Sequence, residues 1–420
     1  MPEKDPGAPL NGLLLADKPP GLTSFDVVAR LRKAAGIKKI GHLGTLDPPA
    51  TGLLALLLGP STRLAPYFSG LAKTYRAGIV LGVETSTLDA TGRYIPPGRV
   101  NAAAGDASGE AGKKAAEAGK IEAGKNEDRD EWREILLKDP GSLSPPEARK
   151  VERERVEEAL SALSGPAPQI PPAVSAVKVD GVRSYALARQ GRAVVLPPRA
   201  VTAFRLELLS FQPPLLEVAA EVSSGYYARA LARDLGLALG LGGGILHSLR
   251  RLSLGRFQVS AAVSLPFSPK EIRERILSPR EALYFLPEYR LTEGEAARVR
   301  RGQALGAGEL ERARLFLPPA GEGFGAPPDD GGEGSLRKQD RLLGFDEYFA
   351  RPESELTPLA GPVKILDPRG ALLGLGEFAG FGAPPKRASG GGDPPDPDAF
   401  WRAFFTPRPF LRPRRILTPL

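Results

Sequence analysis

One aspartate stands in a setting that suits a carboxylate nucleophile. Asp47 lies in the segment GHLGTLDPPATG, between a Gly/Thr turn and two prolines. Proline fixes the backbone φ angle, so this segment holds the aspartate side chain in a defined place, as a nucleophile requires. An isolated Asp-Pro pair, however, is more often an ordinary turn. A catalytic role for Asp47 therefore depends on partner residues elsewhere in the chain.

The residue types that the chain lacks narrow its chemistry. It has no cysteine and only two histidines. This composition excludes disulfides, thiolate catalysis and Cys-ligated zinc or iron–sulfur sites, because each of them needs cysteine. It also excludes a His-rich metal site, whereas a magnesium site built from carboxylates alone remains compatible with it. Carboxylate chemistry at a residue such as Asp47 is not excluded.

Four segments that carry polar and aromatic residues follow one another in order. They are DKPPGLTS at 17–24, GHLGTLDPPATG at 41–52, KTYRAGIVLG at 73–82 and SSGYYARALARDLG at 223–236. Together they resemble the bacterial tRNA pseudouridine-55 synthases, the tRNA pseudouridine synthase B family. The resemblance runs from about Leu13 to Val263 and continues more weakly through LTEGEAARVRRGQ and the last expected strands. Four such segments in this order are not a chance coincidence.

The resemblance implies an isomerase that converts the T-loop uridine at position 55 of tRNA into pseudouridine, with no cofactor and no metal. Asp47 would be the nucleophile, attacking either C6 of the uracil ring or C1′ of the ribose, and both routes need an ionised carboxylate. Arg229, in SSGYYAR, matches the family arginine that pairs with this aspartate, and a neighbouring cation favours the ionised form. Tyr75 matches the family tyrosine that stacks on the target base and takes part in the isomerisation.

Four further residues match family positions near the substrate. The resemblance implies that His42, which directly precedes the Asp47 loop, holds the flipped-out nucleotide through shape and hydrogen bonding. Tyr227 and Leu249 match positions that contact the substrate nucleotide. Lys18, in DKPPG, would support the active-site loop, with direct RNA contact as the alternative.

The spacing of apolar residues predicts the elements that position these side chains. A strand is expected at 13–16, followed by a helix that Thr23 or Ser24 caps and Gly36 ends. The apolar face of that helix is expected to contain Phe25, Val28 and Leu31. Further strands are expected at 53–58, 73–82, 201–211 and 215–225, helices at 151–163 and 227–239, and a loop at 165–181.

These elements and the resemblance together predict an α+β protein with the pseudouridine synthase fold, in which helices flank a mixed, mainly antiparallel central sheet. The catalytic domain is expected at 11–265, with an insert at 97–146 whose Ala, Gly, Lys and Glu composition indicates disorder. A small β-rich RNA-binding domain, PUA-like by resemblance, is expected at 286–420. Pro- and Gly-rich inserts are expected to interrupt it at 318–335 and 382–398.

The charge of the chain suits a nucleic-acid partner. The net charge is +8, and residues 101–150 contain nine Lys/Arg against eleven Asp/Glu, so the positive charge concentrates outside the insert. Phosphate contacts are expected from the helix at 24–33, Lys38, Lys39, Arg250, Arg251 and the arginine-rich 289–301. The expected partner is the T-arm stem-loop of tRNA, recognised by its shape and with the target base flipped out.

The sequence also leads to expectations about the location and assembly of the protein. No stretch reaches the roughly 18 uninterrupted apolar residues of a membrane span, so we expect a cytoplasmic protein without membrane contact. We also expect the protein to act as a monomer. Two alternatives stay open. One is a related synthase directed by a separate guide RNA, against which the DPPATG segment argues. The other is a non-catalytic tRNA-binding or tRNA-folding protein, against which Asp47, Tyr75 and Arg229 argue.

Overall fold

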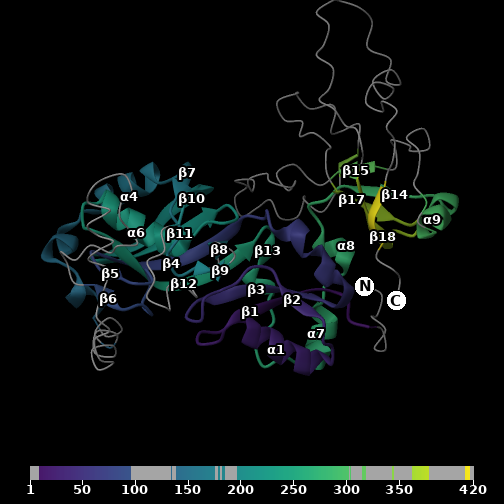
Figure 1. Cartoon of the computed structure of the whole chain (residues 1–420), viewed down its shortest axis with the longest axis horizontal. Helices are drawn as coiled ribbons and strands as arrows, with labels where there is room; N and C mark the ends of the chain where they lie inside the picture. Colours follow the sequence, from purple (N-terminus) through teal and green to yellow (C-terminus); the bar gives the residue numbers. More distant parts are fainter. Residues whose placement is uncertain are drawn as a thin grey trace, which may run out of the picture.

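The computed structural model describes residues 9–95, 134, 139–175, 178–179, 182–184, 196–301, 303, 315–317, 343–344, 362–377 and 412–416. The expected inserts at 318–335 and 382–398 lie outside the described residues, as does most of the insert at 97–146. The described residues form two main sheets, which Figure 1 shows coloured along the sequence.

The larger sheet has nine strands and is mixed but mainly antiparallel, which confirms the predicted fold class. Its path is β1 (Gly12–Lys18), β3 (Thr51–Leu58), β12 (Gly244–Leu254), β4 (Lys73–Leu81), β11 (Leu215–Val222), β10 (Arg199–Gln212) and β7 (Gly165–Gln169). β2 (Ile40–His42) extends it beside β3, and β13 (Phe257–Gln258) beside β12. β12 and β3 pair in parallel, whereas the other neighbours on the path are antiparallel.

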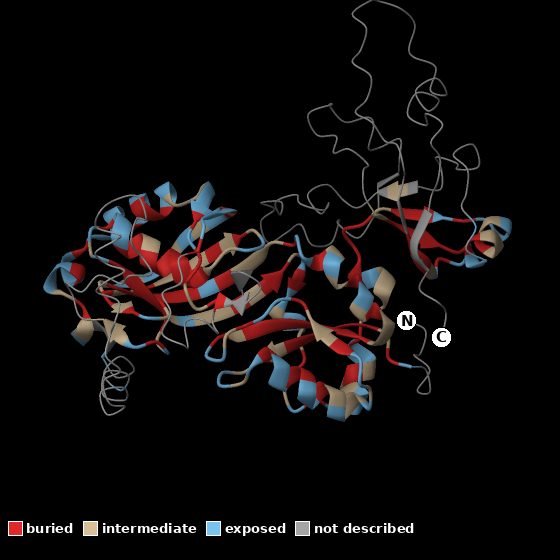
Figure 2. Ribbon diagram, in the orientation of Figure 1, coloured by how far each residue is buried: buried red, intermediate tan, exposed pale blue. Residues whose placement is uncertain are grey.

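Helices pack on the larger sheet in two groups (Figure 1). α6 (Ala228–Ala238) contacts β12 and β4 and α4 (Arg153–Ala162) contacts β10, while α1 (Ser24–Ala35) contacts β2 and α7 (Pro269–Arg275) contacts β1. The strands and the inner faces of these helices form the buried core, red in Figure 2. As expected, α1 begins after Thr23 and ends at Gly36, whose φ of 67° is a left-handed conformation that glycine adopts readily.

A smaller, six-stranded sheet lies towards the C-terminus. Its order is β16 (Leu343–Gly344), β15 (Leu315–Leu317), β14 (Glu288–Arg290), β17 (Pro362–Leu366), β18 (Leu372–Glu377) and β19 (Arg412–Ile416). α8 (Pro279–Ala282) precedes β14, and α9 (Glu293–Arg300) follows it. An Asp-Pro-Arg-Gly turn joins β17 to β18, and the Asp367 carboxylate accepts hydrogen bonds from the N–H groups of Arg369 and Ala371, both at 2.9 Å.

The remaining described elements are short. They are the 3₁₀ helices η1 (Gly59–Phe68), η2 (Pro140–Leu143), η3 (Pro146–Lys150) and η4 (Val259–Ala261), and the strand pairs β5 (Glu84–Thr85) with β6 (Tyr94–Ile95) and β8 (Lys178–Val179) with β9 (Val182–Arg183).

Two expectations about local structure are wrong, and one central strand is missed. Phe25 is 62% exposed. The buried residues of α1 are Ser24, Val27, Val28 and Leu31. The helical rotation that buries those four positions places residue 25 outside their face. Residues 165–169, interpreted as a loop, form β7 and pair with β10. Strand β12 escapes prediction because it begins in a glycine-rich segment and carries two adjacent arginines, so neither apolar nor alternating periodicity is visible.

Candidate active site

Lys18 ties the DKPPG segment to the loop that carries Asp47. Its side chain is fully buried, and its Nζ donates hydrogen bonds to the carbonyl oxygens of Pro19 (3.1 Å), Leu22 (2.6 Å) and Pro48 (3.1 Å). Burial lowers the pKa of Lys18, and the charge of the Asp47 carboxylate opposes that shift. Lys18 therefore joins two carbonyl groups of its own segment to one carbonyl of the loop, an arrangement that suits a structural role.

Ser24, at the start of α1, holds the other side of the same loop. The N–H of Leu46 donates to Ser24 Oγ (2.9 Å), and this hydroxyl donates to the Leu46 carbonyl (3.2 Å). Within the loop, the N–H of Ala50 donates to the Asp47 carbonyl at 3.0 Å. The backbone on both sides of Asp47 is thus fixed before any substrate binds, which is the positional rigidity that a nucleophile needs.

Arg251 fixes both ends of the loop from β12. This side chain is almost wholly buried, and it donates from Nε to the Leu53 carbonyl (2.6 Å) and from Nη2 to the Gly44 carbonyl (3.1 Å). Gly52 has a φ of 99°, and a Cβ there would lie 2.2 Å from the Arg251 carbonyl oxygen. Glycine is required at this position because the backbones of β3 and β12 approach too closely for any side chain.

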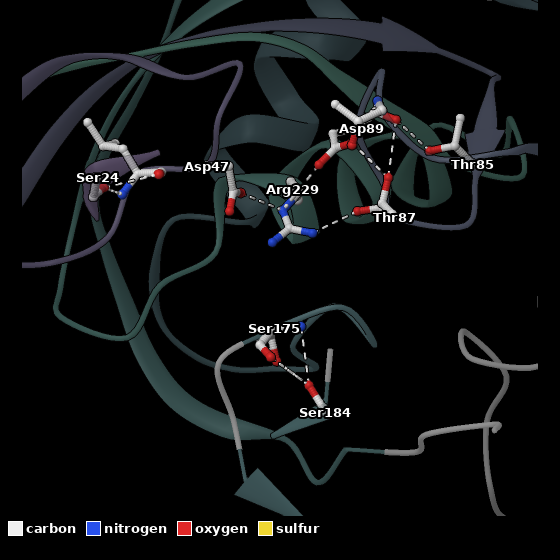
Figure 3. A network of polar contacts seen from close by, with 10 residues as sticks. Ser24, Asp47, Thr85, Thr87, Asp89, Ser175, Ser184 and Arg229 are labelled. Carbon is white, nitrogen blue, oxygen red and sulfur yellow. Dashed lines mark hydrogen bonds and ion pairs between the residues drawn. The ribbon is translucent and has the colours of Figure 1, made fainter. Parts of the chain in front are cut away.

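The carboxylate of Asp47 meets the guanidinium of Arg229. Arg229 Nε lies 3.2 Å from Asp47 Oδ2 and 3.6 Å from Asp89 Oδ2, so the arginine stands between two carboxylates, as Figure 3 shows. Nη1 of Arg229 also donates to the Thr87 carbonyl at 3.0 Å. The Arg229 and Asp89 side chains are each 9% exposed, whereas that of Asp47 is 44% exposed and open to a substrate. The pair expected from the sequence is therefore brought together, and its carboxylate is accessible.

Asp89 is the member of this network that the sequence reasoning missed. Its Oδ1 accepts hydrogen bonds from Thr87 Oγ1 (2.7 Å), Thr91 N (2.8 Å) and Thr91 Oγ1 (2.6 Å), which leaves Oδ2 to face Arg229. A signal was available, because TLDATG at 87–92 repeats the TLD and ATG of the Asp47 loop. Asp89 touches the arginine and not Asp47, so it is a positioning residue that aims the guanidinium.

The start of α6, which carries Arg229, is held by β7. Gln169 accepts a hydrogen bond from the N–H of Tyr227 (2.8 Å), and its side-chain amide donates to the Tyr227 carbonyl (3.3 Å). Arg233, one turn further along α6, donates to the Ile170 carbonyl at 3.0 Å. The segment interpreted as a loop thus sets the position of the helix. Its strand pairing with β10 makes it a rigid support for Arg229.

Three other expected site residues lie on strands of the larger sheet, two of them on the central strands β4 and β12. Tyr75 is buried on β4, opposite Arg251 of β12, and Leu249 is half-buried on β12. His42 is at the end of β2, next to the loop. Burial, and next the charge of Arg251, lowers the pKa of His42, so its imidazole is neutral near pH 7 and able to hydrogen-bond as donor and acceptor. Their contacts with a substrate stay predictions.

Comparison with known proteins identifies the family. The model of the TruB family pseudouridylate synthase N-terminal domain matches residues 32–115 and 119–228. The tRNA pseudouridine synthase B of Leifsonia xyli is 41% identical, with 70% of this chain and 83% of that protein covered. That of Parasynechococcus marenigrum is 40% identical over 70% and 84%, and that of Aquifex aeolicus 35% over 70% and 87%. The chain belongs to the TruB family.

Solved structures agree with this family at the level of the fold. A crystal structure of a Cbf5-Nop10-Gar1 complex contains a chain with a TM-score of 0.52 and 19% identity, with 87% of this chain and 78% of that chain covered. At this identity the likeness supports the pseudouridine synthase fold alone. In the part of the chain that the structure describes, no helix is long and apolar enough to cross a membrane, and no group of three or more His, Asp or Glu side chains could hold a metal ion.

Of the paired arginines of β12 in this member of the TruB family, Arg251 is buried away from the expected phosphate contact, whereas a phosphate contact of Arg250 stays a prediction. Arg251 is buried against the loop carbonyls, so it cannot reach a phosphate. Arg250 forms a two-pronged ion pair with Asp17, from Nη1 to Oδ1 at 3.0 Å and from Nη2 to Oδ2 at 2.6 Å. The Arg250 side chain nevertheless stays 39% exposed, so only the Arg251 guanidinium is enclosed within the protein. The sequence shows the charges of these arginines but not the interior position of their strand.

The buried amine of Lys73 should make the free energy of unfolding depend on pH, and one substitution at this position measures its contribution. Its amine donates to the Leu71 carbonyl (2.9 Å), and burial, then the charge of Arg251, lowers its pKa to about 8. Because the unfolded chain binds this proton more tightly, the cost of charging Lys73 is fully present below pH 8 and fades as the pH rises towards 10.5. The free energy of unfolding of the wild type, minus that of Lys73→Met, should rise by roughly 2 kcal/mol between about pH 7 and 9.5.

Equilibrium urea unfolding of both proteins without RNA, at the two pH values, measures this difference. Subtracting the variant removes the titration of groups that both proteins share. If the free energy of unfolding changes by the same amount with pH in the wild type and in Lys73→Met, the pKa of Lys73 is not lowered by burial.

Proposed function

We propose that this protein isomerises the T-loop uridine at position 55 of tRNA into pseudouridine, with Asp47 as the nucleophile. The observation that carries the proposal is the exposed Asp47 carboxylate on a rigid loop, 3.2 Å from an arginine that is itself held by Asp89 and Thr87. Relatives that share 35–41% of their residues with this chain are named tRNA pseudouridine synthase B, which supports tRNA as the substrate.

The reaction exchanges one bond to the ribose for another. Asp47 attacks either C6 of the uracil or C1′ of the ribose, and the bond between C1′ and N1 breaks. The freed base rotates, C5 bonds to C1′, the C5 proton is lost, and N1 gains a proton, so that product and substrate have the same atoms. Release of the aspartate restores the enzyme. Every step needs the base outside the stacked loop, and the 44% exposure of Asp47 leaves the carboxylate reachable by a flipped-out nucleotide.

The surrounding residues divide the remaining work. Arg229 fixes the direction in which the Asp47 carboxylate points, since its guanidinium is itself held by Asp89 and the Thr87 carbonyl. The Tyr75 ring, on β4, stacks on the base, and Tyr227 and Leu249 contact the substrate nucleotide. His42 holds the flipped-out nucleotide as a neutral hydrogen-bonding group. The residues present supply nucleophile, orientation and stacking.

We also propose the domain arrangement expected from the sequence, a catalytic domain at 11–265 and a PUA-like RNA-binding domain at 286–420. The six-stranded sheet of the described residues is compatible with the second domain. The protein would act in the cytoplasm as a monomer, without a guide RNA. Support for the absence of a guide RNA comes from the 40% identity to a protein named tRNA pseudouridine synthase B and from the DPPATG segment.

Mapping of pseudouridine in tRNA tests the proposal. In cells that lack this protein, pseudouridine should disappear from the T-loop uridine and remain at other positions of tRNA. The purified protein should restore it in an unmodified tRNA transcript without added RNA or protein. Persistence of the T-loop pseudouridine in the deletion strain, or activity only with a guide RNA, would overturn the assignment.

A further inference from the structure

Phe25 is an aromatic side chain that the fold leaves on the surface beside the candidate active site. It is 62% exposed, more than the other large apolar residues that the structure leaves at its surface. It directly follows Ser24, whose hydroxyl holds the backbone of Leu46 in the Asp47 loop. A phenylalanine so exposed loses the stabilisation that burial would supply, and it offers an open ring face to a ligand next to the loop.

Arg32 organises this aromatic ring from two turns further along α1. Helical side chains tilt towards the N-terminus, and the Arg32 guanidinium lies over the Phe25 ring with its Cζ 5.5 Å from the ring centroid. Its Nη2 also donates to the Ile40 carbonyl (3.2 Å) on β2, the strand that ends at His42. Among the described residues, the buried Nε of Arg32 has no hydrogen-bond partner. The ring is thus covered on one face, and its position is fixed relative to β2.

The charge around the ring points to a polyanionic partner. Residues 23–42 contain five Lys/Arg and one acidic residue, Asp26. That carboxylate is occupied in the capping box of α1, where it accepts hydrogen bonds from the N–H (2.8 Å) and hydroxyl (2.6 Å) of Thr23. Lys33, Lys38 and Lys39 are exposed. Cations around an exposed aromatic ring are the composition with which proteins bind single-stranded nucleic acid, the backbone held by charge and a base by stacking.

We propose that Phe25 and Arg32 form a stacking platform for one unpaired base of the RNA substrate, a base other than the uridine that is isomerised. The inference rests on the proposed function, because it places this base in the loop that also carries the target uridine. When the target is flipped towards Asp47, its neighbours lose a stacking partner, and the free face of the Phe25 ring replaces it. The platform therefore stabilises the opened loop beside the reacting nucleotide.

Binding of synthetic T-arm stem-loops tests the platform. The series comprises the intact stem-loop and versions in which each unpaired nucleotide except the target is replaced in turn by an abasic one. Phe25→Leu, which keeps an apolar side chain but removes the π face, should raise the Kd of the intact stem-loop by about 10-fold. For one abasic stem-loop, wild type and variant should bind equally, since the stacked base is already missing. Phe25→Trp should retain wild-type affinity.

Phe204→Leu is the matched control, because Phe204 is a 37% exposed phenylalanine on β10 and should tolerate the same change without effect. The platform is overturned if Phe25→Leu binds the intact stem-loop as tightly as the wild type, or if it weakens every member of the series by the same factor. Pseudouridine formation by the wild type on the intact stem-loop is scored separately. If the wild type forms no pseudouridine, the proposed function is contradicted. The platform is judged separately, from the Kd values of wild type and Phe25→Leu.

Discussion

Asp47→Asn should abolish pseudouridine formation and leave tRNA binding nearly intact. The amide has the shape of the carboxylate and can still accept a hydrogen bond, but it is not a nucleophile, so kcat should fall by at least about 10⁴-fold. The Kd for tRNA should change by less than about threefold, since the variant removes one partly exposed group from a large RNA-binding surface. Single-turnover assays of pseudouridine and filter binding measure the two effects separately.

Asp139→Asn is the control for Asp47, because Asp139 is an exposed aspartate outside the site. It should retain full activity. Unchanged turnover in Asp47→Asn would remove the aspartate from the mechanism and favour the non-catalytic alternative, a protein that binds or folds tRNA. Loss of binding together with turnover would instead mean that the loop itself had been disturbed.

Arg229→Lys should lower kcat by about 10²- to 10³-fold while the positive charge is retained. The guanidinium contacts Asp47, Asp89 and the Thr87 carbonyl at once, from Nε and Nη1. A lysine has a single nitrogen on a flexible stem and cannot hold all three in their present directions. The Asp47 carboxylate would then sample orientations that are unproductive for attack, so kcat should fall far more than KM rises.

Two further variants distinguish a misdirected Arg229 guanidinium from a general disturbance of α6. Asp89→Asn keeps the acceptor for Thr87 and Thr91 but can turn an N–H donor towards Arg229, and it should lose about 10-fold in kcat by misdirecting the guanidinium. Arg233→Lys alters a buried arginine of the same helix that contacts Asp234 and the Ile170 carbonyl but neither Asp47 nor Asp89, so it should lower kcat far less than Arg229→Lys does. Equal losses in Arg229→Lys and Arg233→Lys would indicate a general disturbance of α6.

Much of the fold could be predicted from the sequence, because its elements have strong local signals. The apolar runs of β3 and β4, and the Thr23 and Gly36 boundaries of α1, follow from periodicity and from the conformations that particular residues prefer. Strand β12 could not be recognised, since a central strand that carries two adjacent arginines, one of them buried, has no simple pattern. Its Arg251 donates to carbonyl groups at the two ends of the Asp47 loop, and its Arg250 pairs with Asp17, both far away in sequence.

The candidate site likewise has features that the sequence determines and features that depend on the tertiary structure. The sequence by itself determined which residue types are available: a proline-bounded aspartate, an arginine in a matched helix, a tyrosine in a strand, and a chain without cysteine. Only the tertiary structure decided how they meet. Asp47, Asp89 and Arg229 come from three separate segments, and their contacts depend on sheet pairing and helix packing that local periodicity does not encode.

Phe25 shows the physical reason why residue type alone does not determine burial. Its apolar character predicts burial, but whether a position on a helix is buried depends on how the helix is rotated against the sheet. That rotation is set by the packing of the whole of α1, in which Val27, Val28 and Leu31 are buried and Phe25 is not. The sequence therefore determines the chemistry of each side chain, and the tertiary packing determines which of those side chains a substrate can reach.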